Sequence, residues 1–226
     1  MSEQTVSGEI ARIDASRADL MLERQLPEFA KILPAHVGAE RFARWCLTLL
    51  RKPEMARVMA TPEGQLSVMG ALMDCASLGL EPGREYHLVP FGGTSKDGTP
   101  KPVTVTGVTD YKGEIRLITN AQRCAVIAML VHEKDNFAML GANIPPAHDV
   151  ADWFGDRGPV TGGYAYADFG GQMYSLVVRM SEEEFLRHRE ISRKKDLWDQ
   201  WPEAYRLKTL IHQLRKWVPW SPEWRA

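Results

Sequence analysis

Apolar residues recur at helical spacing through the first third of the chain. Residues 40–52 carry an apolar stripe at i, i+3, i+4, i+7 and i+8, which is typical of a helix with one buried face. The stripe consists of Phe42, Trp45, Cys46, Leu49 and Leu50. An earlier helix is expected over about 15–31, whereas the polar residues 1–14 predict a flexible N-terminus.

A third helix is predicted by its end signals as well as by its apolar residues. Thr61 is placed to cap it, and Pro62 stands in its first turn, where a missing N–H costs little. Gly79 is placed to end it, because glycine adopts the left-handed backbone that closes many helices. Its apolar positions are Leu66, Met69, Leu72, Met73 and Ala76.

After Gly79 the pattern changes to short alternating segments. Residues 85–91 and 102–108 are typical of strands joined by the polar loop 92–101. Residues 110–121 predict a short helix with Asp110 as its cap, and residues 123–132 predict a buried strand. A loop rich in Pro, Gly and Asp follows over residues 141–159.

The last part of the chain predicts a hairpin and more helix. Residues 163–178 alternate around a Gly-Gly pair, which indicates a β-hairpin. Ser181 and Glu184 have capping-box spacing, and a final helix is expected over about 202–218. Helices at both ends of a mostly antiparallel sheet indicate an α+β fold, with one domain over 15–222 and a tail over 223–226.

Composition indicates the cellular compartment of the protein more clearly than it indicates the function. The formal net charge of −1 excludes bulk polycation behaviour but allows a local basic stripe. The three cysteines Cys46, Cys75 and Cys124 form no CxxC motif and predict reduced core residues of a cytosolic protein. No signal peptide is evident, and the longest apolar run, over residues 125–131, is too short to span a bilayer.

Motifs for enzyme chemistry are absent from the sequence. There is no P-loop, no HExxH zinc motif and no GxSxG nucleophile elbow. His87 lies in a strand pattern and is expected to be packed or hydrogen-bonded. The cluster His148, Asp149, Asp152 and Asp156 offers oxygen ligands for a divalent cation, but aspartate is also common in turns. We therefore expect no catalytic site, with a metal-dependent nuclease using these aspartates as the alternative.

The C-terminal third has the composition of a single-strand binding surface. Between residues 185 and 217, nine Lys and Arg residues stand against four Asp and Glu residues. Cations that hold phosphates and rings that stack on bases suit single strands. Lys208, His212 and Arg215 form a stripe beside an apolar helix face. A solvated helix face would have the same pattern, and tryptophans are more often core residues. The interleaved aromatics are Trp198, Trp201, Tyr205 and Trp217. The apolar helix face consists of Ala204, Leu207, Ile211, Leu214 and Val218.

Four segments together resemble a known family. "MGALMDCASLGLEPG", "HLVPFG", "TGVTDYKGEIRLI" and "WPEAYRLKTLIHQLRKWVPWS" stand in the order and approximate spacing of the RecT family of phage-type single-strand DNA annealing proteins. The resemblance covers roughly residues 41–222. It implies ATP-independent pairing of complementary strands by an oligomeric ring or filament. It also implies β-hairpins packed by helices, and a cytoplasmic location in a bacterial host.

The resemblance also implies a set of DNA-binding residues. Lys112 matches the family's basic position before a glycine, Lys208 matches the lysine of its "KT" signature, and Arg215 and Lys216 match basic positions near the final proline. We expect Tyr111 and Lys112 at a helix N-terminus, where backbone N–H groups favour phosphate. The complete predicted set is Tyr111, Lys112, Arg116, Arg193, Lys194, Lys195, Trp198, Lys208, His212, Arg215 and Lys216.

The expected partners follow from the same resemblance. They are single-stranded DNA, the annealed duplex intermediate, further copies of the chain, a phage exonuclease and the host single-strand-binding protein, with no membrane. Phe42, Trp45 and Leu49 are candidates for subunit contacts, and simple core packing explains them equally well. We expect no cofactor and no catalytic or metal-binding residue, with Mg²⁺ acting only on the DNA or on annealing. The family's further C-terminal partner module is expected to be absent, either because this member lacks it or because the chain is truncated. A passive single-strand coat is the nearer alternative, and the nuclease is the more distant one.

Overall fold

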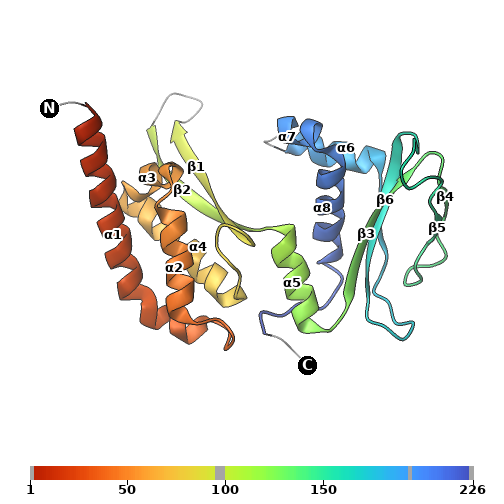
Figure 1. Cartoon of the computed structure of the whole chain (residues 1–226), viewed down its shortest axis with the longest axis horizontal. Helices are drawn as coiled ribbons and strands as arrows, with labels where there is room; N and C mark the ends of the chain where they lie inside the picture. The colour runs from red at the N-terminus through yellow and green to blue at the C-terminus, as the bar shows by residue number, and fades with distance from the viewer. Residues whose placement is uncertain (1–2, 95–99, 193–194, 224–226) are drawn as a thin grey trace. The chain divides into compact units, whose positions relative to one another are not determined.

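The computed structural model describes residues 3–94, 100–192 and 195–223 (Figure 1). The chain divides into two compact units, Met1–Gly113 and Glu114–Ala226. Helices and antiparallel strands occur in both units, which confirms the predicted α+β class. In the described part of the chain, none of the helices combines the length and apolar character that crossing a membrane requires. The assignment of 15–222 to one annealing domain stays a prediction.

Four helices begin the first unit. They are α1 (Glu3–Ile32), α2 (Ala39–Leu50), α3 (Pro53–Met59) and α4 (Pro62–Leu78). Helix α1 begins twelve residues before the predicted start at 15. A polar composition does not exclude a helix, and once a helix exists each further residue adds a backbone hydrogen bond. Polarity alone therefore misplaced this boundary.

The core of the first unit forms where α1, α2 and α4 meet. Phe29 and Phe42 pack edge to face with ring centroids 5.1 Å apart. The predicted face of α2 is buried except for Trp45, which is half-buried. The predicted positions on α4 were partly wrong, because Leu66 is 75% exposed. Its buried residues are Gly64, Val68, Ala71, Leu72, Cys75 and Ala76.

A two-stranded antiparallel ribbon determines which face of α4 is buried. It pairs β1 (Tyr86–Thr94) with β2 (Pro100–Thr109), as predicted. A Cβ on Gly64 would lie 2.8 Å from the backbone oxygen of Val103, so β2 approaches α4 at this glycine. The backbone N–H of Val105 donates to Ser67 Oγ at 2.9 Å. Tertiary contact, not apolar periodicity, therefore selects the buried side.

Both predicted ends of α4 are confirmed. The Thr61 side chain accepts a hydrogen bond from the Gly64 N–H at 3.1 Å. Gly79 has φ +65°, and its N–H and that of Leu80 satisfy carbonyls of the last turn. The sequence therefore sets the limits of this helix even though it does not set its orientation.

The second unit is a three-stranded antiparallel sheet with a layer on each face (Figure 1). The strand order is β3-β6-β7, with β3 (Ala125–His132), β6 (Val160–Asp168) and β7 (Val178–Ser181). Helices α6 (Glu182–Ile191) and α8 (Pro202–Leu214) cover one face, and α7 (Lys195–Gln200) packs against both helices. The core between them contains Leu130, Ala165, Met180, Phe185, Leu210 and Leu214.

The small hairpin β4 (Asn136–Ala138) and β5 (Ala147–Asp149) lies on the other face of this sheet (Figure 1). The Phe137 ring on β4 stacks on Tyr164 of β6, with centroids 5.6 Å apart. The segment 141–159, predicted to be entirely loop, thus contains a short strand. Burial of β3 is also less complete than predicted, since only Leu130 and Val131 are fully buried.

The predicted hairpin at 163–178 is partly correct. Gly170 and Gly171 form the turn with positive φ, and the chain returns antiparallel to β6. Regular pairing resumes only at Val178, however, because the Ser175 side chain accepts the bond from the Ala167 N–H. The predicted capping box at Ser181 and Glu184 is confirmed by both of its hydrogen bonds.

Candidate nucleic-acid interface

Helix α5 (Tyr111–Ala121) carries the first group of predicted DNA-binding residues. Tyr111 and Lys112 lie in its first turn, and the Lys112 ammonium is 5.9 Å from the Tyr111 ring centroid. Arg116 is four residues after Lys112, which places both on one side of the helix. Helix α5 begins in the first unit and continues into the second.

The N-terminus of α5 is less suited to phosphate than expected. Asp110 Oδ1 accepts the backbone N–H of Lys112 at 3.1 Å, which confirms its predicted capping role. His87 Nε2 lies 3.5 Å from Asp110 Oδ2, so His87 has the polar contact expected of it. A carboxylate already occupies the positive end of this helix. Any DNA contact here therefore rests on the side chains of Lys112 and Arg116.

Within the second unit, α5 and α8 are joined by a buried carboxylate. Glu114 is fully buried, and its Oε1 lies 2.6 Å from Nδ1 of the exposed His212. The Ser221 N–H also donates to the Leu117 carbonyl, which holds the chain after α8 against α5. The sequence pointed to His212 but did not predict its contact with Glu114, because the two residues are distant along the chain.

The predicted stripe of α8 is present beside this contact. Lys208, His212 and Arg215 fall at i, i+4 and i+7 on α8 and its C-cap. The Arg215 guanidinium lies 5.0 Å from the ring centroid of Trp220. Its Nε is buried and has no hydrogen-bond partner among the described residues. Buried donors are nearly always paired, so this N–H is an exception that no contact among the described residues explains.

The other predicted residues are arranged differently. Lys195 pairs with Glu190 at 2.5 Å, and Lys216 donates to Gln213 at 2.8 Å. Trp198 is 6% exposed and packs against the core, so its ring does not face solvent for stacking. Its role in DNA binding stays a prediction, now with a packing role beside it. Arg193 and Lys194 lie outside the described residues.

A second basic surface was missed by the sequence reasoning. A groove of about 510 Å³ in the second unit lies among β7, α6 and the end of α8. Arg179, Arg187 and His188 line it together with Gln213 and Trp217, which is 63% exposed. No periodicity in the sequence could have placed Arg179, on a strand, beside the helical residues of α6.

The stripe and the groove flank α8. Successive residues turn by about 100° around an α-helix, which places Gln213 roughly 140° from Lys208. The buried residues Leu210, Ile211 and Leu214 occupy the side of α8 that faces the sheet. Two cationic surfaces therefore border one exposed ridge of the same helix.

The acidic segment predicted as a cation site has other contacts. Asp152 accepts the Phe154 N–H at 2.9 Å, and Asp156 pairs with Lys134 at 2.6 Å. His148 Nε2 lies 3.0 Å from Asp135 Oδ2. Within residues 3–94, 100–192 and 195–223, there is no group of three or more His, Cys, Asp or Glu side chains placed to hold a metal ion.

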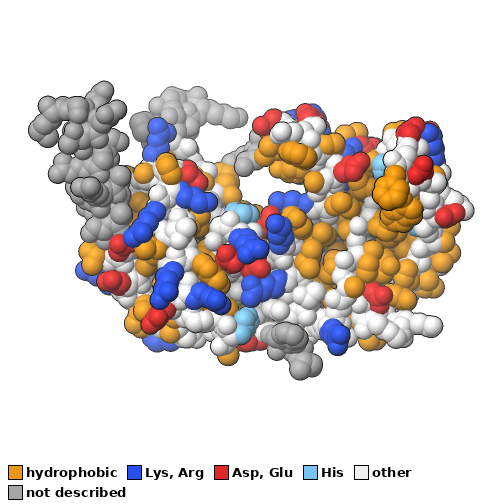
Figure 2. Space-filling view, in the orientation of Figure 1, with side chains coloured by type: hydrophobic (Ala, Val, Ile, Leu, Met, Phe, Trp, Pro, Cys, Tyr) orange, Lys and Arg blue, Asp and Glu red, His pale blue; other side chains and the backbone are white. Residues whose placement is uncertain are grey.

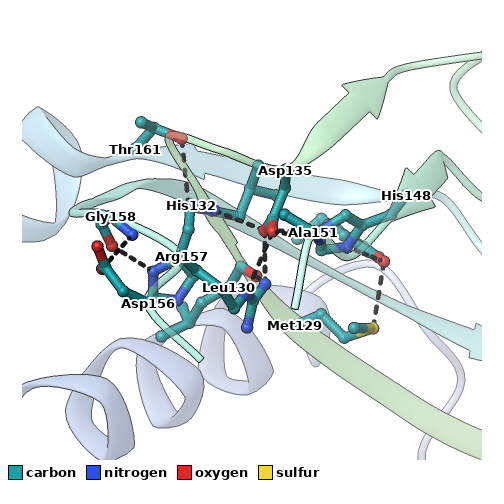
Figure 3. A network of polar contacts seen from close by, with 12 residues as sticks. Met129, Leu130, His132, Asp135, His148, Ala151, Asp156, Arg157, Gly158 and Thr161 are labelled. Carbon is teal, nitrogen blue, oxygen red and sulfur yellow. Dashed lines mark hydrogen bonds and ion pairs between the residues drawn. The ribbon is translucent and has the colours of Figure 1, made fainter. Parts of the chain in front are cut away.

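Asp135 is the centre of a buried polar network (Figure 3). Its carboxylate is fully enclosed and accepts bonds from Arg157, His148 and the backbone N–H groups of His132 and Ala151. The neighbouring Arg157 guanidinium, first of all, holds the pKa of Asp135 far below its ordinary range. The network fixes the loop after β5 to the end of β3.

Comparison with known proteins agrees with the resemblance found in the sequence. Residues 40–225 match the model of the RecT family. The chain is 30% identical to Protein RecT of Escherichia coli (strain K12) over 203 residues, covering 87% of this chain and 72% of the relative. The match includes α8, which carries the stripe, and β7 and α6, which line the groove together with the end of α8. The chain therefore belongs to the RecT family.

Proposed function

We propose that the protein is a single-strand DNA annealing protein of phage-type recombination, which pairs complementary strands without ATP. One observation carries the site: Lys208, His212 and Arg215 form a cationic stripe along α8, and the Arg215 guanidinium lies 5.0 Å from the centroid of the half-exposed Trp220 ring. A guanidinium can bind a phosphate oxygen, and the ring beside it offers a surface for a base. Membership of the RecT family supports this function.

In this mechanism the protein contacts the phosphate backbone of the DNA. Arg116, Lys208 and Arg215 hold the phosphates of one strand, which leaves its base edges open. A complementary strand then pairs by its own base-pairing free energy, so no nucleotide hydrolysis is needed. Oligomerisation extends the bound strand from one copy of the chain to the next.

The partners of this reaction are part of the proposal. The protein acts beside an exonuclease that supplies single strands and in competition with the host's single-strand-binding protein. It holds no metal of its own, and Mg²⁺ acts on the DNA. A cytoplasmic location follows from these partners.

The decisive experiment uses two complementary oligonucleotides, one carrying a fluorophore and the other a quencher. Purified protein is added to one strand and then mixed with the other, without nucleotide and with or without EDTA. Quenching faster than in the protein-free control, unchanged by ATP or EDTA, is the expected result. Tight binding without acceleration identifies a passive coat, and metal-dependent fragments on a denaturing gel identify a nuclease.

The site is tested by a double variant, Lys208→Ala with Arg215→Ala. Each lost phosphate contact should make the slope of log K against log salt less negative by about 0.7, so the pair should change it by roughly 1.4. The matched control is Lys31→Ala with Lys134→Ala, two exposed lysines outside the stripe. An unchanged slope in the stripe variant would remove Lys208 and Arg215 from the interface.

A further inference from the structure

The loop between β5 and β6 presents two adjacent aromatic side chains to solvent. Trp153 is 69% exposed and Phe154 is 101% exposed. We call these two residues the aromatic tip. In Figure 2, hydrophobic side chains gather over the region of β4, β5 and β6, with acidic side chains at their border. Two large neighbouring rings in water indicate a surface that another molecule covers.

Hydrogen bonds within the loop and to the buried Asp135 network hold the backbone of the aromatic tip. The Ala151 N–H donates to Asp135 at 3.2 Å on one side of the tip, and Arg157 donates to Asp135 on the other. Asp152 caps the Phe154 N–H within the loop. These hydrogen bonds restrain the backbone of the tip, so less backbone freedom is lost when the tip binds.

Charge excludes nucleic acid and anionic lipid as the occupant. Between residues 133 and 158, five Asp and Glu residues stand against one lysine and one arginine. That arginine, Arg157, is directed at Asp135 inside the loop. Phosphates would be repelled by the remaining acidic side chains. The aromatic tip therefore fits a protein surface that combines apolar area with positive charge.

The same chain offers such a surface on α2. A shallow recess of about 580 Å³ is bordered by Arg41, Arg44 and Trp45, with Glu40 at its edge. The Arg41 guanidinium lies 5.7 Å from the Trp45 ring centroid. Arg44 is largely exposed, and its contact with Glu40 is a loose 3.7 Å. Cations beside an indole can contact both an aromatic ring and a carboxylate that lies next to that ring.

We infer that the aromatic tip of one copy docks in the α2 recess of a second copy. Trp153 and Phe154 fill the recess against Trp45, and Asp152 lies near Arg44. The groove at β7 also joins arginines with an indole, but Glu184 lines it and Arg187 is paired with Glu183 at 2.6 Å, so it offers less positive charge to an acidic tip than the recess does. Where the tip–recess contact is not reciprocated within one pair of copies, it is heterologous and repeats into a ring or filament.

The test is site-specific cross-linking without DNA. Phe154 is replaced by the photoreactive p-benzoylphenylalanine in a mixture of ¹⁴N- and ¹⁵N-labelled protein. The expected product is a mixed-isotope cross-link to residues 38–45. Cross-links within one chain, to other segments, or none at all would overturn the inference. The inference rests on the assembly part of the proposed function, and omitting DNA keeps this result separate from the annealing assay.

A second measurement covers the chance that the photoreactive side chain disturbs the contact. The Trp153→Ala, Phe154→Ala double variant and the recess variant Arg44→Glu should each sediment as smaller species than the unchanged protein. Ile191→Ala removes an exposed apolar side chain at the end of α6 and should sediment normally. If the tip variant assembles like the unchanged protein, or if the unchanged protein is monomeric, the inference fails whatever the annealing assay gives.

Discussion

Asp135 shows how much one residue can organise when its carboxylate is buried. It joins the end of β3, the strand β5 and the loop that carries the aromatic tip. Nothing in the sequence separated it from the neighbouring Asp149, Asp152 and Asp156, which are equally acidic. Asp135 differs from them because it lies close to Arg157 and His148. These residues come together only after β3 and β6 pair.

Replacing Asp135 by Asn should strongly destabilise the second unit. The change keeps the size of the side chain but leaves the Arg157 guanidinium without its charged partner. Breaking a buried ion pair costs about 3–5 kcal/mol, and urea unfolding measures this loss. Asp156→Asn is the control, because its pair with Lys134 is exposed to solvent and contributes little to stability. Equal losses in both variants would contradict the central role of Asp135.

The same residue predicts how stability responds to acid. Because the folded pKa of Asp135 is depressed, its contribution is fully present above the ordinary Asp pKa of about 3.9 and is lost as the pH falls below it. The free energy of unfolding should therefore drop steeply in that acid range for the unchanged protein. Asp135→Asn should show a shallower drop, as measured by urea unfolding at a series of pH values.

At the scale of elements, the sequence predicted where helices begin and end better than it predicted which face of an element is buried. Thr61, Gly79 and the pair Ser181–Glu184 act locally, so their spacing was sufficient to predict caps that the structure confirms. The buried face of α4 depends on β2, and the late start of β7 depends on Ser175. Both are tertiary effects between segments that no short window of sequence contains.

Two glycines of α4 should respond to alanine with opposite signs. Gly70 is exposed within the helix with open space around it, so Gly70→Ala should raise the free energy of unfolding by roughly 0.5–1 kcal/mol. Gly79 has φ +65°, and a Cβ there would lie 2.6 Å from Pro34 Cγ. Gly79→Ala should therefore lower it by more than about 1 kcal/mol. Urea unfolding compares the two, and a shared sign would show that helix propensity outweighs the C-terminal cap.

At the scale of the whole molecule, a net charge of −1 conceals a separation of charge. In the second unit, residues 133–158 are acidic, whereas the stripe and the groove beside α8 are cationic. The sequence revealed the basic composition of the C-terminal third. It did not reveal the groove, because Arg179 and Trp217 meet only through the packing of β7, α6 and α8.

This separation predicts two different responses to salt. Binding to an oligonucleotide should weaken steeply as salt rises, because cations that contact phosphates displace counterions. Assembly through the aromatic tip should change much less, because apolar contact supplies most of it. Fluorescence anisotropy measures the first and sedimentation without DNA measures the second. Equal salt dependence would indicate that charge, not the aromatic tip, controls assembly.

The long connection between β3 and β6 also affects the order in which parts of the protein fold. The strands are neighbours in the sheet, yet residues 133–159 separate them along the chain. Contacts between distant segments form late in folding, since the loop must close before pairing stabilises it. Asp135 meets Arg157 only at that stage, and Trp153 and Phe154 are fixed only then. A newly made chain would therefore complete the loop that carries the aromatic tip only after β3 and β6 pair, so copies without this pairing could not dock through the tip.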